Sequence, residues 1–74
     1  MPTITISSVE DLGKALRALR KSRGLTQRDA AKMCDVSLPF LNALERGKPT
    51  AQIGKALGVC QYFGITITLN LPEQ

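Results

Sequence analysis

The reactive side chains of this 74-residue sequence do not combine into a catalytic or metal-binding pattern. Histidine is absent from the sequence, which excludes histidine acid–base catalysis and histidine metal ligands. The two cysteines, Cys34 and Cys60, lie far apart without a CxxC spacing, which favours buried, reduced thiols over a zinc site or a disulfide framework. A glycine-rich phosphate loop and paired carboxylates are also absent from the sequence. We therefore expect no enzyme, no cofactor and no metal.

The strongest chemical signal is a concentration of positive charge. The chain has 10 Lys and Arg residues against 6 Asp and Glu residues, a net charge of +4. Seven of the basic residues fall within residues 14–32, where Asp29 is the single acid, and residues 49–74 are neutral. This asymmetry is typical of a chain whose first half faces a polyanion and whose second half packs on protein. A solvated basic face without a partner is the alternative.

Length and hydropathy narrow the class of protein further. A domain of 74 residues buries only about 60% of the surface that its unfolded chain exposes, so its stability is marginal without a partner. No apolar run approaches the roughly 18 residues that a membrane span needs. The N-terminal segment also lacks the basic flank and apolar stretch of a secretory signal. We expect a cytoplasmic protein with no membrane partner.

The first part of the basic half has the apolar periodicity of a helix. Apolar residues recur at steps of three and four from Val9 to Leu19, which places them on one face. Ser7 and Glu10 have the spacing of a capping box, and Gly24 is suited to the residue after the last turn. The pattern predicts a first helix that follows an N-terminal segment, residues 1–8, with a possible short strand.

Two short helices are predicted next. Thr26 begins a capping box and a helix over about residues 26–34. Ser37 offers the N-cap of a helix over about residues 38–46, in which Pro39 lies in the first turn, where a missing N–H has no cost. Two such helices joined by a tight turn form a helix-turn-helix, whose second helix enters the DNA major groove.

The neutral half predicts a fourth helix that begins at Thr50 and ends at Gly64. The apolar residues expected on its core-facing side are Ile53, Ala56, Leu57, Cys60 and Phe63. Val59 and Tyr62 lie off this stripe, and they suit a partner surface or plain exposure equally well. Along with this stripe, the residues expected in the core are Leu12, Leu16, Leu19, Leu41 and Leu44.

The final segment, residues 65–71, alternates strictly between apolar and polar side chains, which predicts a β-strand. Its apolar face is formed by Ile65, Ile67, Leu69 and Leu71. A lone strand after four helices leaves its backbone groups unpaired and its apolar face uncovered. The alternating stretch 3–6 could pair with part of it. The same strand of a second copy is the better partner, so we expect a homodimer.

Residues 25–50, LTQRDAAKMCDVSLPFLNALERGKPT, resemble the lambda-repressor-like (Xre family) helix-turn-helix. The matching details are Gly24-Leu25-Thr26-Gln27 at the start, Ala31, Val36-Ser37 at the turn, and Leu44-Glu45-Arg46-Gly47 at the end. The continuation through Lys48-Pro49-Thr50 to a strand resembles the HipB-type antitoxins of that family. The resemblance implies a mainly α fold. It has a four-helix lambda-repressor-like helix-turn-helix domain over residues 9–64 and a C-terminal β-strand, residues 65–71, that pairs across a homodimer.

The resemblance also implies which side chains contact DNA. The base-reading residues are Ser37, Leu38, Pro39 and Asn42, and the phosphate-contacting residues are Thr26, Gln27, Arg28, Arg46 and Lys48. Asn42 is the strongest candidate for a base contact, because an amide can form two hydrogen bonds with adenine. Gln27 matches a glutamine that braces the phosphate backbone and supports base readers. Glu45 matches a glutamate that pairs with an arginine of the first helix, here Arg20 or Arg17.

The sequence departs from the family pattern at Leu38-Pro39-Phe40, where many relatives have polar residues. In one interpretation, Leu38 and Pro39 contact thymine methyl groups while DNA shape supplies the remaining specificity. In the other, Leu38 and Phe40 face the core or a protein partner, and DNA recognition is weaker. The sequence favours the first, with Phe40 mostly buried in both.

The resemblance leads to one main functional hypothesis and two alternatives. The main hypothesis is a sequence-specific transcriptional repressor that binds a palindromic operator in double-stranded DNA as a homodimer and regulates its own operon. The same protein would be the antitoxin of a toxin–antitoxin module whose toxin is a HipA-like serine/threonine kinase. The alternatives are a protein-interaction module that mainly inhibits a partner enzyme, and a free-standing Xre-type repressor without a toxin.

Overall fold

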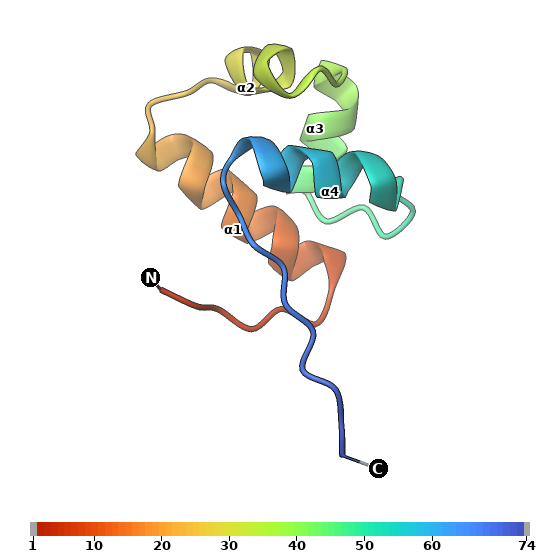
Figure 1. The fold of residues 1–74 in the computed structure, drawn as a ribbon. Helices are drawn as coiled ribbons and strands as arrows, with labels where there is room; N and C mark the ends of the chain where they lie inside the picture. The colour runs from red at the N-terminus through yellow and green to blue at the C-terminus, as the bar shows by residue number, and fades with distance from the viewer. Residues whose placement is uncertain (1, 74) are drawn as a thin grey trace.

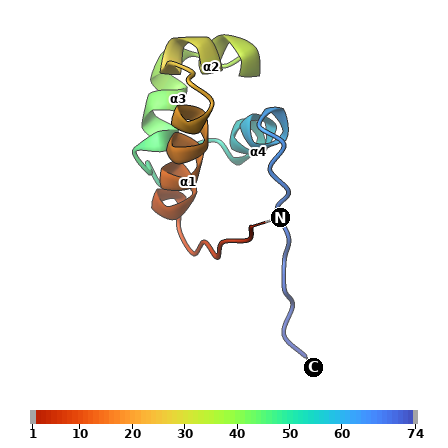
Figure 2. The ribbon, with the colours of Figure 1, turned by 90° about the vertical axis from the view of Figure 1, so that its left-hand side faces the viewer.

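The computed structural model describes residues 2–73, which form four helices. Three of them, α1 (Val9–Ser22), α2 (Gln27–Cys34) and α3 (Leu38–Glu45), lie together, and α4 (Ile53–Tyr62) packs beside them (Figure 1). The view turned by 90° shows α4 on one side of the other three (Figure 2). The helical part of the fold is therefore the mainly α, four-helix arrangement that the sequence predicts.

The start of α1 differs from the prediction by one residue. Ser8, not Ser7, is the N-cap, and its side chain accepts a hydrogen bond from the N–H of Asp11 at 3.0 Å. The Asp11 carboxylate accepts bonds from the N–H of Ser7 at 2.9 Å and from its hydroxyl at 3.2 Å. Chiefly through the bond from the Ser7 N–H, these contacts lower the pKa of Asp11 from its usual value. The cap is thus strongest with Asp11 ionised and weakens as the pH falls through that lowered pKa.

The caps of the two short helices are confirmed. The Thr26 hydroxyl accepts a hydrogen bond from the N–H of Asp29 at 3.0 Å, and the Asp29 carboxylate completes the capping box. The Ser37 hydroxyl accepts a bond from the N–H of Phe40 at 3.1 Å. Between these helices, Asp35 ends α2 in the left-handed conformation with φ of 55°, which makes the turn tight. Local side-chain chemistry therefore determines how α3 starts relative to α2.

The core lies where all four helices meet. Its buried hydrophobic residues are Leu16, Ala30, Ala31, Cys34, Leu41, Leu44, Ala56, Val59, Cys60 and Phe63. Leu12 and Leu19 are partly buried against this cluster. Both cysteines are free and buried, and burial raises the pKa of each thiol, which favours the protonated form. The expectation that both cysteines are buried is confirmed.

The prediction for α4 was wrong in its start and in part of its core face. A turn, in which the N–H of Ala51 donates to the carbonyl of Lys48 at 3.2 Å, takes up the first residues, so α4 begins at Ile53 instead of Thr50. Val59 is fully buried, whereas Ile53 and Leu57 are 69% and 42% exposed. The small and medium-sized side chains of this helix pack inward, which leaves Ile53 and Leu57 on the surface.

The predicted C-terminal strand is not present in the single chain. No residue between 2 and 73 is in a β-strand, neither in the stretch 3–6 nor in residues 65–71 (Met1 lies outside the described residues). After the N–H of Ile65 donates to the carbonyl of Cys60 at 2.9 Å, the chain runs away from the helices as an extended segment (Figure 1). The physical reason is that a strand needs a ladder of hydrogen bonds, and this segment meets no second strand within its own chain.

Gly13 allows α1 to approach α3 closely. A Cβ atom at this position would collide with the carbonyl oxygen of Leu44 and lie 2.7 Å from that of Glu45. We therefore expect Gly13→Ala to lower the free energy of unfolding by about 1–3 kcal/mol, measured by urea denaturation. Gly54→Ala is the matched control, because its Cβ meets nothing and alanine favours a helix by up to about 1 kcal/mol. Equal stability of Gly13→Ala and the wild type would contradict this packing.

Candidate nucleic-acid interface

The third helix has an inner and an outer face. Leu41 and Leu44 are completely buried on the inner side. Pro39, Asn42 and Arg46 follow one another at steps of three and four residues, which places them along the opposite side, with Pro39 and Arg46 exposed and Asn42 partly exposed. This outer face therefore carries three of the residues that the sequence analysis predicted to contact DNA.

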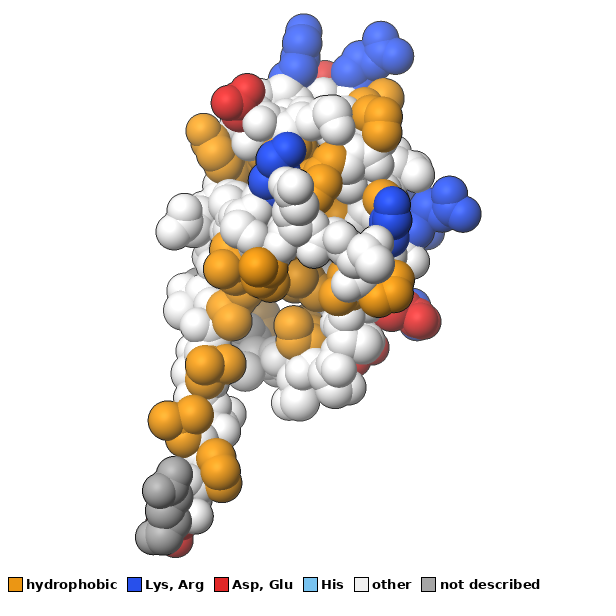
Figure 3. Space-filling view, turned by 90° about the vertical axis from the view of Figure 1, so that its right-hand side faces the viewer, with side chains coloured by type: hydrophobic (Ala, Val, Ile, Leu, Met, Phe, Trp, Pro, Cys, Tyr) orange, Lys and Arg blue, Asp and Glu red, His pale blue; other side chains and the backbone are white. Residues whose placement is uncertain are grey.

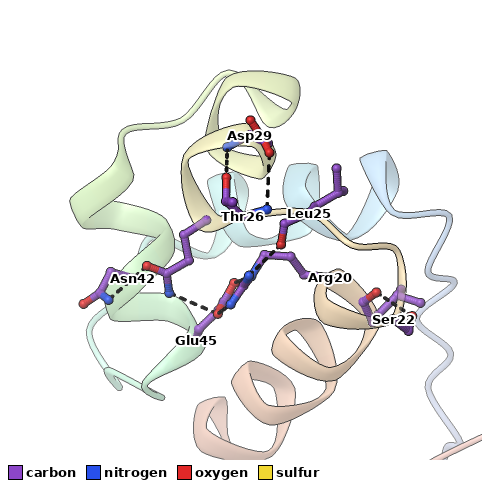
Figure 4. Close-up of polar contacts among 9 residues, drawn as sticks. Arg20, Ser22, Leu25, Thr26, Asp29, Asn42 and Glu45 are labelled. Atoms are coloured by element: carbon purple, nitrogen blue, oxygen red, sulfur yellow. Dashed lines mark hydrogen bonds and ion pairs between the residues drawn. The ribbon is translucent and has the colours of Figure 1, made fainter.

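A buried ion pair lies directly behind this face. Arg20 of α1 donates to both carboxylate oxygens of Glu45 in α3, from Nε to Oε2 at 2.8 Å and from Nη2 to Oε1 at 3.0 Å (Figure 4). Its remaining Nη1 donates to the carbonyl of Leu25 at 2.8 Å, just before α2. Arg20 and Glu45 are only 7% and 6% exposed. The structure thus resolves the predicted alternatives for the partner of Glu45 in favour of Arg20.

Two amides connect this ion pair to the outer face of α3. Gln27, the first residue of α2, donates from Nε2 to Oε1 of Glu45 at 3.1 Å. Asn42 donates from Nδ2 to Oε1 of Gln27 at 3.2 Å, and Figure 4 shows it at the outer end of this row of contacts. The sequence analysis expected Gln27 to support the base readers. The structure gives it a specific contact with Asn42, the residue expected to read a base.

Two adjoining hollows surround these groups. The first is lined by Glu10, Lys14, Arg17, Arg20, Gln27, Asn42, Glu45 and Arg46. The second is lined by Asn42, Ala43, Arg46, Gly47, Lys48 and Pro49. Four of the predicted DNA-contacting residues, Gln27, Asn42, Arg46 and Lys48, therefore meet at these hollows.

The other predicted contact residues lie at the starts of the two short helices. Thr26 is the N-cap of α2, and Arg28, the second residue of that helix, is exposed. Ser37 is the exposed N-cap of α3. None of these three residues lines either hollow. Their contact with DNA remains a prediction that depends on how far a duplex extends beyond the hollows.

Lys14 and Arg17 are the residues whose position the sequence analysis missed. Both are exposed, and both line the hollow that contains Asn42. The signal was present in their spacing, because residues 14, 17 and 20 follow one another at three-residue steps on α1 and Arg20 points into the interface. Positive charge therefore extends across the hollow from α1 to Arg46.

In the Leu38-Pro39-Phe40 stretch, the first two side chains lie on the surface and the third packs against the core. Leu38 is 38% exposed and Pro39 is exposed, so both lie where DNA could reach them. Phe40 is partly buried against the core, and the ammonium of Lys55 lies 5.7 Å from the centre of its ring. Leu38 therefore does not face the core, and its exposure suits contact with DNA or with a protein partner, while Phe40 packs inward as both interpretations expect.

The fold and this site define a helix-turn-helix protein. A family model described as "Helix-turn-helix" (HTH_3) matches residues 16–70. The uncharacterized HTH-type transcriptional regulator y4mF of Sinorhizobium fredii is 43% identical over 69 residues, which cover 93% of this chain and 91% of that protein. The HTH-type transcriptional regulator DdrOP3 of Deinococcus deserti is 36% identical over 56 residues, 76% of this chain and 43% of that protein. The chain therefore belongs to the helix-turn-helix family of DNA-binding transcriptional regulators, which are not enzymes.

Solved structures share the whole fold. HipB in the HipB–O4 20mer complex has a TM-score of 0.83 with 20% identity, covering 96% of this chain and 100% of that chain. A HipA–HipB–O2–O3 complex contains a chain with the same TM-score, identity and coverage. At this level of identity the likeness is one of fold. Within residues 2–73, none of the helices has the length and apolar character needed to cross a membrane.

The buried ion pair gives a stability prediction. We expect Glu45→Ala to lower the free energy of unfolding by about 3–5 kcal/mol, because it leaves the Arg20 guanidinium buried without its partner. Glu10→Ala is the matched control, because it breaks the exposed Glu10–Lys14 pair of 3.3 Å and should change stability by less than about 0.5 kcal/mol. Urea denaturation followed by circular dichroism measures both variants. A similar small effect for the two would show that the buried pair contributes no more than a surface pair.

Proposed function

We propose that this protein is a sequence-specific transcriptional repressor that places α3 in the major groove of its operator. The observation that carries the proposal is the row of contacts from Glu45 through Gln27 to Asn42, which presents a positioned amide on the outer face of α3. A base contact requires a side chain held in a defined orientation, and this amide is held at one end by a buried ion pair. In the proposed complex, Ser37, Leu38 and Pro39 join Asn42 at the base edges.

The phosphate contacts are proposed on either side of this helix. Thr26, Gln27 and Arg28 lie at the N-terminus of α2, where free backbone N–H groups and the helix dipole favour an anion. Arg46 and Lys48 follow the C-terminal end of α3 and line the second hollow. Contacts of this kind hold the protein in register on the duplex and make its binding depend on salt.

A homodimer is proposed through the neutral half of the chain. Large hydrophobic side chains remain exposed along α4 and the C-terminal segment, namely Ile53, Leu57, Tyr62, Ile67, Leu69 and Leu71. Figure 3 shows hydrophobic side chains gathered on this side of the body and continuing along the extended segment. Pairing residues 65–71 of two copies would supply the missing backbone ladder and cover part of this surface. Two copies of α3 would then reach half-sites about one helical turn apart on a palindromic operator.

The antitoxin role is the finer part of the proposal. The support is the fold that this chain shares with HipB, which occurs with HipA in the HipA–HipB–O2–O3 complex. The proposed toxin is a HipA-like serine/threonine kinase, which this protein would restrain by forming a complex with it in the cytoplasm. The proposed operator lies at the promoter of the protein's own operon, so that the module represses itself.

A second candidate function is a protein-interaction module that mainly inhibits a partner enzyme. The observation that favours it is the exposure of Met33 and Leu38, two large apolar side chains on neighbouring helices, in addition to the apolar surface of α4. In that case, DNA binding would be secondary. A free-standing repressor would instead bind its operator and inhibit no kinase.

The DNA prediction concerns the two amides. We expect Asn42→Ala combined with Gln27→Ala to lose the preference for DNA upstream of the protein's own gene over a scrambled duplex, measured by gel shift. The same variant should still inhibit the partner kinase, because the amides lie on the DNA-facing side. Asn70→Ala is the control, since it removes an amide from the C-terminal segment, away from both hollows. A wild-type protein with no preference over scrambled DNA would contradict the repressor proposal.

Salt dependence provides an independent measurement of the phosphate contacts. The logarithm of the wild-type affinity should fall steeply and linearly with the logarithm of salt concentration, and Arg28→Ala should reduce that slope by about 1. A flat dependence would show that the basic half does not contact phosphates.

The dimer prediction uses two neighbouring residues of the C-terminal segment. Leu69 and Asn70 are both exposed in the single chain, and they point to opposite faces of an extended segment. We expect Leu69→Asp to convert a dimer into a monomer in sedimentation, because it places a charge on the buried face, whereas Asn70→Asp should remain dimeric. Equal masses for the two variants would contradict pairing through this face.

A further inference from the structure

We infer that Glu45, which has no contact with DNA in the proposed complex, determines the class of base that Asn42 accepts. The class is a base that carries an exocyclic amino group in the major groove, adenine or cytosine, in preference to one that carries a keto oxygen there. The inference rests on the proposed function, because it assumes that the outer face of α3 meets base edges. It adds to the proposed function a positioning residue, Glu45, which acts through Gln27 on Asn42. It also adds a rule for which base Asn42 prefers.

The first step is the direction of the Gln27 amide. Both oxygens of Glu45 accept hydrogen bonds from Arg20, and Oε1 also faces the side chain of Gln27 at 3.1 Å. A carboxylate that is paired in this way has only lone pairs to offer, so it can only accept. Gln27 must therefore turn its NH2 group toward Glu45. Its carbonyl oxygen, on the other side of the planar amide, is then directed toward Asn42.

The second step is the orientation of the Asn42 amide, which follows from that of Gln27. Because Oε1 of Gln27 can only accept, Asn42 must face it with Nδ2, as the contact of 3.2 Å shows. The Oδ1 atom of Asn42 is left pointing away from Gln27, together with the second N–H of Nδ2. Asn42 is only partly exposed, and its amide cannot exchange the two ends without placing two oxygens or two NH2 groups against each other.

The third step is the match to bases. An oxygen at the outer end of Asn42 accepts a hydrogen bond from the N6 amino group of adenine or the N4 amino group of cytosine. The same oxygen is repelled by O6 of guanine and O4 of thymine. The second N–H of Asn42 can donate to N7 of adenine, a partner that cytosine does not offer. The expected order at this position is therefore adenine, then cytosine, then the two keto bases.

The test measures base preference at each position of the duplex. A library of random duplexes is selected with the wild-type protein, and the position read by Asn42 is identified as the one whose preference is lost in Asn42→Ala. At this position the wild type should bind adenine about tenfold more tightly than guanine. A wild-type preference for guanine or thymine at that position would overturn the inference.

Two substitutions of Gln27 change the hydrogen bond that Asn42 receives or donates, while Arg20 and Glu45 themselves stay in place. Gln27→Leu removes the hydrogen bonds and frees the Asn42 amide to turn, so the ratio between amino and keto bases should fall to about twofold or less at that position alone. Gln27→Lys places a cation beside Glu45. The lysine ammonium has no acceptor, so it can only donate a hydrogen bond to Asn42. The Asn42 amide should then turn its oxygen inward and its NH2 group outward, so that guanine becomes the preferred base.

The control separates this effect from a general loss of phosphate contacts. Arg28→Ala removes a charge from the neighbouring residue, and it should weaken binding to all duplexes while leaving the base ratio unchanged. Retention of the adenine preference in both Gln27→Leu and Gln27→Lys would overturn the inference while leaving the proposed function intact. Failure of the wild type to select any sequence would contradict the proposed function and, with it, this inference.

Discussion

The ion pair between Arg20 and Glu45 is the contact on which the rest of the structure depends. Two charges removed from water are stable only if nearly every donor and acceptor is satisfied, and here the guanidinium contacts both carboxylate oxygens and the Leu25 carbonyl. These bonds tie α1 to α3 and to the start of α2. Gly13 makes the geometry possible, because α1 approaches the backbone of α3 at the carbonyls of Leu44 and Glu45.

The same pair links the stability of the fold to the proposed recognition of bases. A buried ion pair contributes little net stability compared with a well-packed apolar pair, but it imposes direction, because each charge accepts only one kind of partner. Gln27 satisfies the remaining capacity of the Glu45 carboxylate, and Asn42 satisfies Gln27. The amide on the surface of α3 is thus oriented by a charge in the interior, which a solvated surface amide would not be.

Interactions between residues close in the sequence allowed much of the fold to be predicted. Features that depend on contacts between distant residues could not be predicted from the sequence. Thr26 and Ser37 were predicted correctly as caps because each acts within three residues, whereas the cap of α1 was predicted at Ser7 and lies one residue later, at Ser8. The burial of Val59 in place of Ile53 and Leu57 depends on how α4 rotates against the other helices, and sequence periodicity does not determine that rotation. The pairing of Glu45 with Arg20 instead of Arg17 could not be predicted, because only the folded chain brings these residues together. The same holds for the contact between Gln27 and Asn42.

The first helix connects the two halves of the molecule. At its C-cap, Arg23 donates to the carbonyl of Phe63 at 2.9 Å and lies 5.4 Å from the centre of the Phe63 ring, where the chain leaves α4. About one turn earlier, Arg20 holds Glu45 and therefore α3. One helix thus holds both α3, through Arg20, and the start of the C-terminal segment, through Arg23. In a dimer built through that segment, the separation of the two copies of α3 would follow from the stiffness of α1, because both contacts move with it.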